Sequence, residues 1–199
     1  MTIYDLKPRF QDWLRPHMVR LHEAGATPNQ LTLAALALSG ATGVAIVASS
    51  AVPALLLLVP VALFVRMALN ALDGMMAREF DLSSPTGQLL NEVGDVVSDV
   101  VLYLPFAVHV GTWPVVTFVV LALLTEFVGV VGQSICGERV YDGPMGKSDR
   151  AFAVGLLSLL LYWWPGTGWS LWFHLLSALT AVSFRNRCRR ILGTDEAGR

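Results

Sequence analysis

The sequence predicts an all-α integral membrane protein, with six transmembrane helices that follow an N-terminal interfacial amphipathic segment. Hydrophobic residues make up 54% of the 199 residues and charged residues only 15%, and the mean hydropathy is +0.57. Ordinary soluble domains carry a clearly larger charged share. The apolar residues are also collected in long continuous segments, which favours helices over barrel strands. Two cysteines are too few for a disulfide scaffold.

The first 26 residues are expected to form the interfacial segment on the cytoplasmic side. They lack the apolar core of a signal peptide. Pro8 and Pro16 interrupt the run, which indicates short amphipathic helices that lie along the membrane surface. A solvated tail is the alternative. The interfacial interpretation is preferred because apolar residues follow helical spacing, namely Phe10, Trp13, Leu14, Met18 and Leu21.

Residues 27–190 are expected to form the membrane domain, and residues 191–199 a cytoplasmic tail. A transmembrane helix needs about 20 predominantly apolar residues. The fifth of the segments that fit is short and would borrow flanking residues. The six expected spans are Leu31–Ser50, Val52–Ala77, Gly87–Val110, Trp113–Cys136, Arg150–Trp164 and Trp169–Arg187.

The connections between these spans predict the orientation in the membrane. Basic residues mark the cytoplasmic side. They occur near both termini and in the connections 78–81 and 138–150, whereas the other connections carry no charge. Both termini are therefore expected in the cytoplasm. The sequence indicates a multi-pass protein of the inner (cytoplasmic) membrane.

Polar residues on the second and third expected spans form the candidate functional site. Asn70 and Asp73 share one helical face, and Asn91 and Asp95 share another. A charged residue at the centre of a span costs about 2.5–3.5 kcal/mol, so such residues are functional candidates by default. The two helices are antiparallel around a short connection. Their four oxygen-bearing side chains can meet in a cavity open to the cytoplasm, where they suit Mg²⁺ or Mn²⁺.

Small residues beside these polar groups indicate phosphate binding. Gly74 and Ala77 leave one helix face nearly bare, so a ligand could approach the backbone there. Ser84 is a plausible N-cap, and Gly87 lies in the first turn after it, where free N–H groups favour an anion. Helix packing explains any single glycine equally well or better, but the combination favours a ligand site.

The spacing of these residues resembles the motif of the CDP-alcohol phosphotransferase family, D-x2-D-G-x2-A-R-x8-G-x3-D-x3-D. The segments "TPNQLT" and "GPMGKSDRA" also resemble the segments before that family's first and fifth spans. Six of the eight motif positions match, and the two departures are both Asp to Asn. The corresponding residues here are Asn70, Asp73, Gly74, Ala77, Arg78, Gly87, Asn91 and Asp95.

The resemblance implies a transferase of phospholipid synthesis. A hydroxyl group of an acceptor alcohol would attack a CDP-linked lipid, usually CDP-diacylglycerol, and CMP would leave. Asp73 and Asp95 would be catalytic, and a divalent cation would be held by Asn70, Asp73, Asn91 and Asp95. The cytidine and phosphate end would be bound by Asp73, Gly74, Ala77, Arg78 and Gly87. The resemblance also implies a homodimer, and no nucleic-acid partner is expected.

The two asparagines lower the charge of the expected metal site. An amide oxygen can ligate a hard cation but brings no negative charge. Glu92 and Asp99 are two further candidate ligands, because with Asp95 they form an acidic stripe on the third span. The alternative is that they pair with Arg66 or with another helix. The sequence leaves both interpretations open.

Basic residues near the expected cavity mouth could bind a phosphate on the acceptor. These are Arg139, Lys147 and Arg150, although positive-inside topology explains them more simply. Three functional classes fit these features: a phosphatidyltransferase, a non-catalytic relative that binds CDP-lipid or a membrane partner, and a transporter. The transporter is the weakest, because no paired broken helices are evident. Glu126 lies in mid-span, and the sequence names no partner for it.

Overall fold

The computed structural model describes residues 3–166 and 168–197, and every regular element in this part of the chain is helical. Helix α1 covers Ile3–Glu23 and helix α2 covers Pro28–Ala48. Short 3-10 helices precede α3 and follow α4, at Pro53–Leu57 and Leu104–Phe106. The remaining helices are α3 (Leu58–Glu79), α4 (Pro85–Tyr103), α5 (Ala107–Val110), α6 (Thr112–Cys136), α7 (Lys147–Trp163) and α8 (Ser170–Ala197).

The prediction of a helical membrane protein is confirmed. Within the described ranges, four segments are long and apolar enough to cross a membrane: Pro28–Ala48, Pro53–Glu79, Pro85–Val110 and Thr112–Cys136. They correspond to the first four expected spans. The fifth and sixth expected spans fall on α7, which has 17 residues, and on α8, whose second half is rich in arginine.

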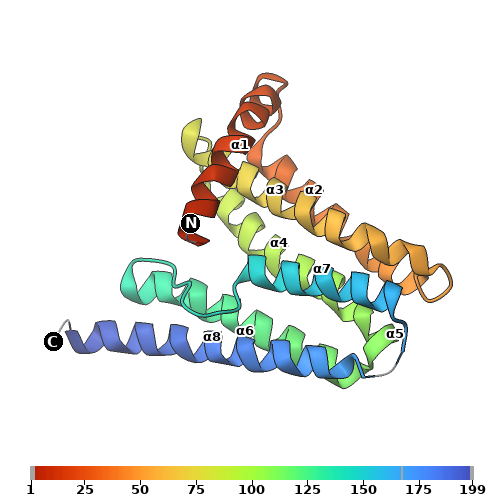
Figure 1. The fold of residues 1–199 in the computed structure, drawn as a ribbon. Coiled ribbons are helices and arrows are strands. Elements are labelled where there is room, and N and C mark those ends of the chain that lie inside the picture. The colour runs from red at the N-terminus through yellow and green to blue at the C-terminus, as the bar shows by residue number, and fades with distance from the viewer. Residues whose placement is uncertain (1–2, 167, 198–199) are drawn as a thin grey trace.

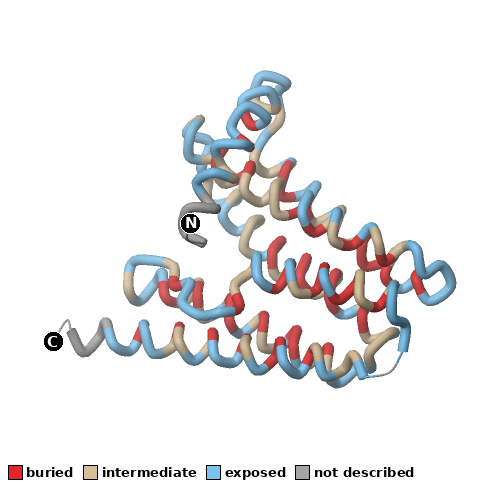
Figure 2. The backbone as a smooth tube through the Cα atoms, viewed as in Figure 1, coloured by how far each residue is buried: buried red, intermediate tan, exposed pale blue. Residues whose placement is uncertain are grey.

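The helices form an elongated bundle whose connections alternate between two ends (Figure 1). The α3–α4 and α6–α7 connections and both termini lie at one end. The turns after α2, α5 and α7 lie at the other end. Helix α2 packs against both α3 and α4, α7 packs against α3, and α6 packs against α8. Buried residues follow the inward faces of these helices, as Figure 2 shows.

The N-terminal segment differs from the expectation of short helices broken by proline. Residues Ile3–Glu23 form one continuous α-helix with Pro8 and Pro16 inside it. A proline in a helix interior destabilises the helix by about 3 kcal/mol. Burial of a large apolar side chain stabilises the fold by about 1.5–3 kcal/mol. Leu14 and Met18 are both buried in a cluster with side chains of α3. This packing keeps the helix continuous through both prolines.

Aromatic packing holds the bundle together away from the polar residues. The rings of Phe118 on α6 and Phe173 on α8 meet edge to face with centroids 5.4 Å apart. Tyr103 at the end of α4 packs on Phe118 at 5.5 Å. All three side chains are fully buried. This core fixes the relative positions of α4, α6 and α8, and hence of the polar side chains that they carry.

The connection 137–146 is packed tightly onto α6 and α8. The backbone N–H of Met145 donates to the Ser183 hydroxyl at 2.8 Å. Gly143 adopts a φ of +126°, and a Cβ atom there would lie 2.4 Å from the Cα of Ser183. Only glycine fits this close approach at a positive φ. This packing places Arg139 and Lys147 near the acidic side chains of α4 and α6.

Candidate active site

The polar faces of α3 and α4 meet, as the sequence predicted. The Asn70 amide nitrogen donates a hydrogen bond of 3.0 Å to Oδ1 of Asp95. Asp73 and Asp95 are both buried, with 5% and 7% of the whole residue exposed. Asn91 lies half-buried one turn before Asp95 on α4. Two carboxyl groups and two amides are therefore gathered near the end of the bundle that carries both termini.

Helix α2 contributes a residue to this site that sequence reasoning missed. The hydroxyl of Thr32 donates a hydrogen bond of 2.7 Å to Oδ2 of Asp73. Thr32 is buried, and α2 begins at a capping box in which Thr27 and Gln30 exchange side-chain hydrogen bonds with the backbone. Thr27 and Thr32 are the first and last residues of the "TPNQLT" segment, so the resemblance of this segment to the family pointed to the region. Its contact with Asp73, 41 positions away, was not predictable from it.

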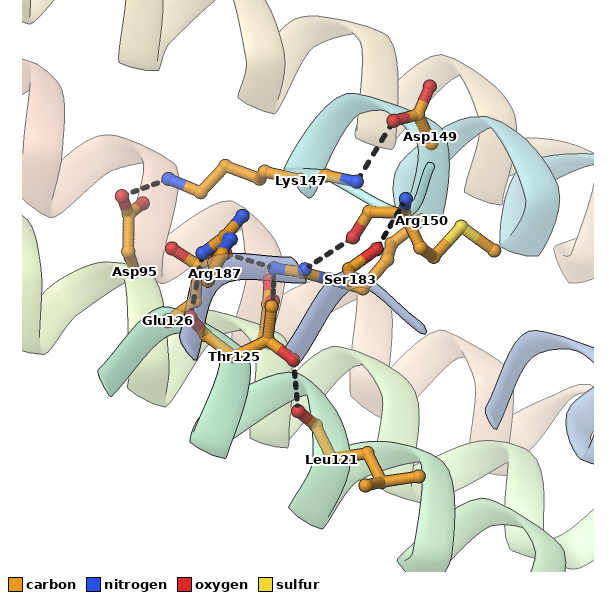
Figure 3. A network of polar contacts seen from close by, with 12 residues as sticks. Asp95, Leu121, Thr125, Glu126, Lys147, Asp149, Arg150, Ser183 and Arg187 are labelled. Carbon is orange, nitrogen blue, oxygen red and sulfur yellow. Dashed lines mark hydrogen bonds and ion pairs between the residues drawn. The ribbon is translucent and has the colours of Figure 1, made fainter. Parts of the chain in front are cut away.

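Lys147 reaches Asp95 from the first turn of α7. Its ammonium group forms an ion pair with Oδ2 of Asp95, and Figure 3 shows the long side chain extended across to α4. The Lys147 side chain is 26% exposed, whereas that of Asp95 is 9% exposed. Both oxygens of the Asp95 carboxylate therefore contact nitrogen atoms of the protein itself.

The expected nucleotide-binding residues lie around the α3–α4 connection. Gly74 lies beside the Arg78 side chain, since a Cβ there would be 3.3 Å from an Arg78 guanidinium nitrogen. Arg78 is exposed in the last turn of α3. The predicted N-cap is confirmed: the Ser84 hydroxyl accepts a 3.0 Å hydrogen bond from the N–H of Gly87. That N–H is consequently engaged by the cap, and is not free for an anion as the sequence suggested.

Glu92 and Asp99 form ion pairs with arginine side chains. This agrees with the interpretation that they pair with Arg66 or with another helix. Asp99 is buried and contacts Arg66 of α3 at 2.8 Å and Arg150 of α7 at 3.0 Å. Glu92 forms an ion pair with Arg139. The carboxylate of Asp99 is thus enclosed by guanidinium groups from two other helices. Such an arrangement balances charge in a low-dielectric interior.

Glu126 is the centre of an arginine cluster that the sequence did not reveal. Its carboxylate contacts Arg139 and Arg150 at 2.8 Å each, and Arg187 at 3.9 Å. Arg187 also donates to the carbonyl oxygen of Thr125 at 2.6 Å. These residues come from α6, α7, α8 and the connection 137–146, as Figure 3 shows for most of them. The periodicity of one helix carries no information about such partners.

The three expected acceptor-binding residues differ in their accessibility. Arg150 is fully buried, and its guanidinium group contacts Asp99, Glu126 and the Met145 carbonyl. The Arg139 side chain is 15% exposed. Burial lowers the pKa of Arg139, but the nearby carboxylate of Glu92 raises it, so the pKa lies above its ordinary value and the group stays charged.

Few oxygen donors are available to a hard cation in this arrangement. In the described ranges, no group of three or more His, Cys, Asp or Glu side chains could hold a metal ion. Asp73 and Asn91 present oxygen atoms of the kind that Mg²⁺ and Mn²⁺ prefer. The Asp95 carboxylate is already in contact with Asn70 and Lys147.

Comparisons with known proteins bear on the fold and the family of this chain. Inner membrane protein YnbA of Escherichia coli (strain K12) is 46% identical over 198 residues, covering 96% of this chain and 97% of that protein. Mycobacterium tuberculosis phosphatidylinositol phosphate synthase (PgsA1) shares the fold. Its structure with manganese and citrate gives a TM-score of 0.71 at 18% identity, covering 89% of this chain and 88% of PgsA1. Its structure with CDP-DAG bound gives 0.64 at 19% identity, covering 88% and 92%. The family model for CDP-alcohol phosphatidyltransferase matches residues 26–183, so the chain belongs to this family.

Proposed function

We propose that this protein transfers a phosphatidyl group from a CDP-linked lipid, CDP-diacylglycerol, to the hydroxyl of an acceptor alcohol and releases CMP. The observation that carries the proposal is the pair of buried carboxyl groups, Asp73 and Asp95, placed on two helices beside Gly74 and Arg78. Family membership supports it. So does the CDP-DAG bound to PgsA1, which has the same fold.

Each residue of the site has a proposed role. Gly74, Ala77, Arg78 and Gly87 bind the cytidine and phosphate end of the lipid, with Arg78 offering an exposed positive charge. The cation is held at Asp73 and Asn91, within the polar group that Asn70 and Asp95 complete. A bound Mg²⁺ or Mn²⁺ would neutralise the diphosphate and the leaving CMP.

The attacking hydroxyl needs a proton acceptor and a binding site. We assign proton acceptance to Asp95, whose carboxylate forms an ion pair with Lys147 at the polar centre of the bundle. Arg139 and Lys147 have side chains that are 15% and 26% exposed, and they are the candidates to contact a phosphate on the acceptor. Arg150 is fully buried and is not available to the acceptor.

The proposal includes the membrane setting. Helices α7 and α8 complete six spans, and both termini and the active site face the cytoplasm of an inner membrane. The common end of the termini and the basic connections supports this orientation (Figure 1). The location named for the Escherichia coli relative supports the choice of membrane. We further propose a homodimer, on the family resemblance alone.

The test is release of CMP from CDP-diacylglycerol by the purified protein in liposomes. A panel of acceptors would include glycerol phosphate, inositol phosphate and unphosphorylated alcohols, each with and without Mn²⁺. We expect release that depends on both the cation and one acceptor class, with a matching lipid product. Folded protein that releases no CMP with any acceptor would contradict the proposal.

A non-catalytic relative that binds CDP-lipid is the second candidate. One observation favours it: both oxygens of the Asp95 carboxylate contact nitrogen atoms of the protein itself. Saturable binding of CDP-diacylglycerol without CMP release from any acceptor would identify this function.

A further inference from the structure

The contacts of Asp95 explain how the site tolerates asparagine at two of the four acidic positions of the family motif. Oδ1 accepts a hydrogen bond from the Asn70 amide, and Oδ2 pairs with the Lys147 ammonium group. We infer that Lys147 takes the place of one divalent cation at Asp95, so that the protein holds a single cation, bound together with the nucleotide diphosphate. The inference rests on the proposed function in that it assumes a CDP-linked ligand.

The first step concerns position 70. The Asn70 nitrogen lies 3.0 Å from Oδ1 of Asp95 and donates to it. A carboxylate at the same position would place two negative oxygens side by side, and a cation or a shared proton would be needed to relieve the repulsion. The amide removes that need, because it supplies a donor of its own. The asparagine at position 70 therefore fits a site that has no cation between the side chains of Asn70 and Asp95.

The second step concerns Lys147. It is the first residue of α7, where the partial positive charge of the helix N-terminus disfavours a cation. Helix stability therefore gives no reason for a lysine at this position. Its side chain instead extends to the buried Asp95 on another helix (Figure 3). An ammonium group placed there supplies the positive charge that Asp95 would otherwise take from a metal ion.

The third step concerns the net charge of the side chains at the site. Asp73 and Asp95 with Lys147 leave one net negative charge, because Asn70 and Asn91 are neutral. A divalent cation is held weakly by one net charge and a few oxygen atoms. The diphosphate of a CDP-linked ligand would supply the missing negative charges. The cation and the nucleotide should therefore bind together.

The experiment counts bound Mn²⁺ by electron paramagnetic resonance, on the full chain in lipid nanodiscs, with and without CDP. The wild-type protein should bind at most one Mn²⁺, and only when CDP is present. Lys147→Met should bind Mn²⁺ without CDP, with an affinity raised about tenfold or more, since removal of the ammonium group leaves Asp95 uncompensated. Lys147→Arg, which keeps the charge, should behave like the wild type, as should Lys7→Met, which removes the chain's other lysine.

Asn70→Asp provides a second variant that leaves Lys147 in place. It should also raise Mn²⁺ affinity without CDP, and combined with Lys147→Met it should hold two Mn²⁺ ions. Thermal unfolding would establish that each variant is folded. Two Mn²⁺ ions on the wild-type protein, or an unchanged or weaker Mn²⁺ affinity in folded Lys147→Met and Asn70→Asp, would overturn the inference. Mn²⁺ binding is read without turnover, so failure of CMP release alone would refute the proposed function and leave this inference standing.

Discussion

At the scale of single residues, Asp73 and Asp95 are held by different kinds of partner. Asp73 accepts from the neutral hydroxyl of Thr32 at 2.7 Å, whereas Asp95 contacts an ammonium group and an amide. Asp73 is thus the less compensated acid and the stronger candidate to ligate a cation. Asp95 is the better candidate to exchange a proton with the acceptor.

Removal of either charge should stop the reaction. Asp73→Asn and Asp95→Asn are each expected to lower CMP release by about 100-fold or more, because catalysis depends on electrostatic stabilisation by placed charges. Both variants should remain folded and inserted. Glu23→Gln, an exposed acid on α1, is the matched control and should retain activity. Activity within about tenfold of the wild type in both variants would remove the pair from the mechanism.

The asparagines offer a test in the opposite direction. Restoring Asn70→Asp and Asn91→Asp together should move the Mn²⁺ dependence of CMP release to lower concentration, because two added carboxylates strengthen cation binding. The structure places Glu92 and Asp99 in ion pairs, so Glu92→Gln should leave this dependence unchanged. A lower Mn²⁺ affinity in Glu92→Gln would instead return Glu92 to the ligand set.

At the scale of the helix, α2 and α4 approach each other closely at Gly43. A Cβ atom at Gly43 of α2 would lie 2.1 Å from the carbonyl oxygen of Val101 on α4, whereas one at Gly40 would meet open space. The Gly43→Ala variant must push the two helices apart. We expect a clear fall in thermal stability and in CMP release.

Gly40→Ala is the matched control on the same helix. Alanine is preferred to glycine in a helix interior by about 1 kcal/mol, so this variant should be as stable as the wild type or slightly more stable. Differential scanning fluorimetry in detergent would compare the two. Equal stability of Gly43→Ala and Gly40→Ala would contradict the close packing of α2 on α4.

Asp99 on α4 forms ion pairs with residues of both α3 and α7, so it connects three helices. Its carboxylate contacts Arg66 at 2.8 Å and Arg150 at 3.0 Å, and all three side chains are buried. Breaking a buried ion pair by removing one partner costs about 3–5 kcal/mol. Asp99→Asn should therefore lower the unfolding temperature markedly. Glu138→Gln, in an exposed pair of 3.7 Å with Arg190, should leave it unchanged.

At the scale of the whole molecule, both termini and the two basic connections lie at one end of the bundle (Figure 1). In a variant without Cys136 and Cys188, single cysteines at the exposed positions 83 and 138 should be protected from membrane-impermeant reagents added outside. Cysteines at the exposed positions 50 and 166 should be labelled. Labelling of position 83 or 138 from outside would overturn the proposed orientation.

The sequence by itself determined the helical membrane fold and the meeting of the polar faces of the second and third spans. Long apolar segments predict helices because a lipid bilayer leaves few ways to satisfy the backbone. Residues three or four apart on one helix share a face whatever the rest of the chain does. The meeting of Asn70 with Asp95 followed from that rule and a short connection between two helices.

Only the tertiary structure decided which partner each charged residue meets. Thr32 on Asp73, Lys147 on Asp95 and three arginines around Glu126 all come from other helices or from a distant connection. Local propensity also misjudged α1, where packing on α3 outweighs two prolines. The physical reason is common to both. Periodicity acts within one helix, whereas burial and charge pairing depend on how separate helices pack, and that information is spread along the whole chain.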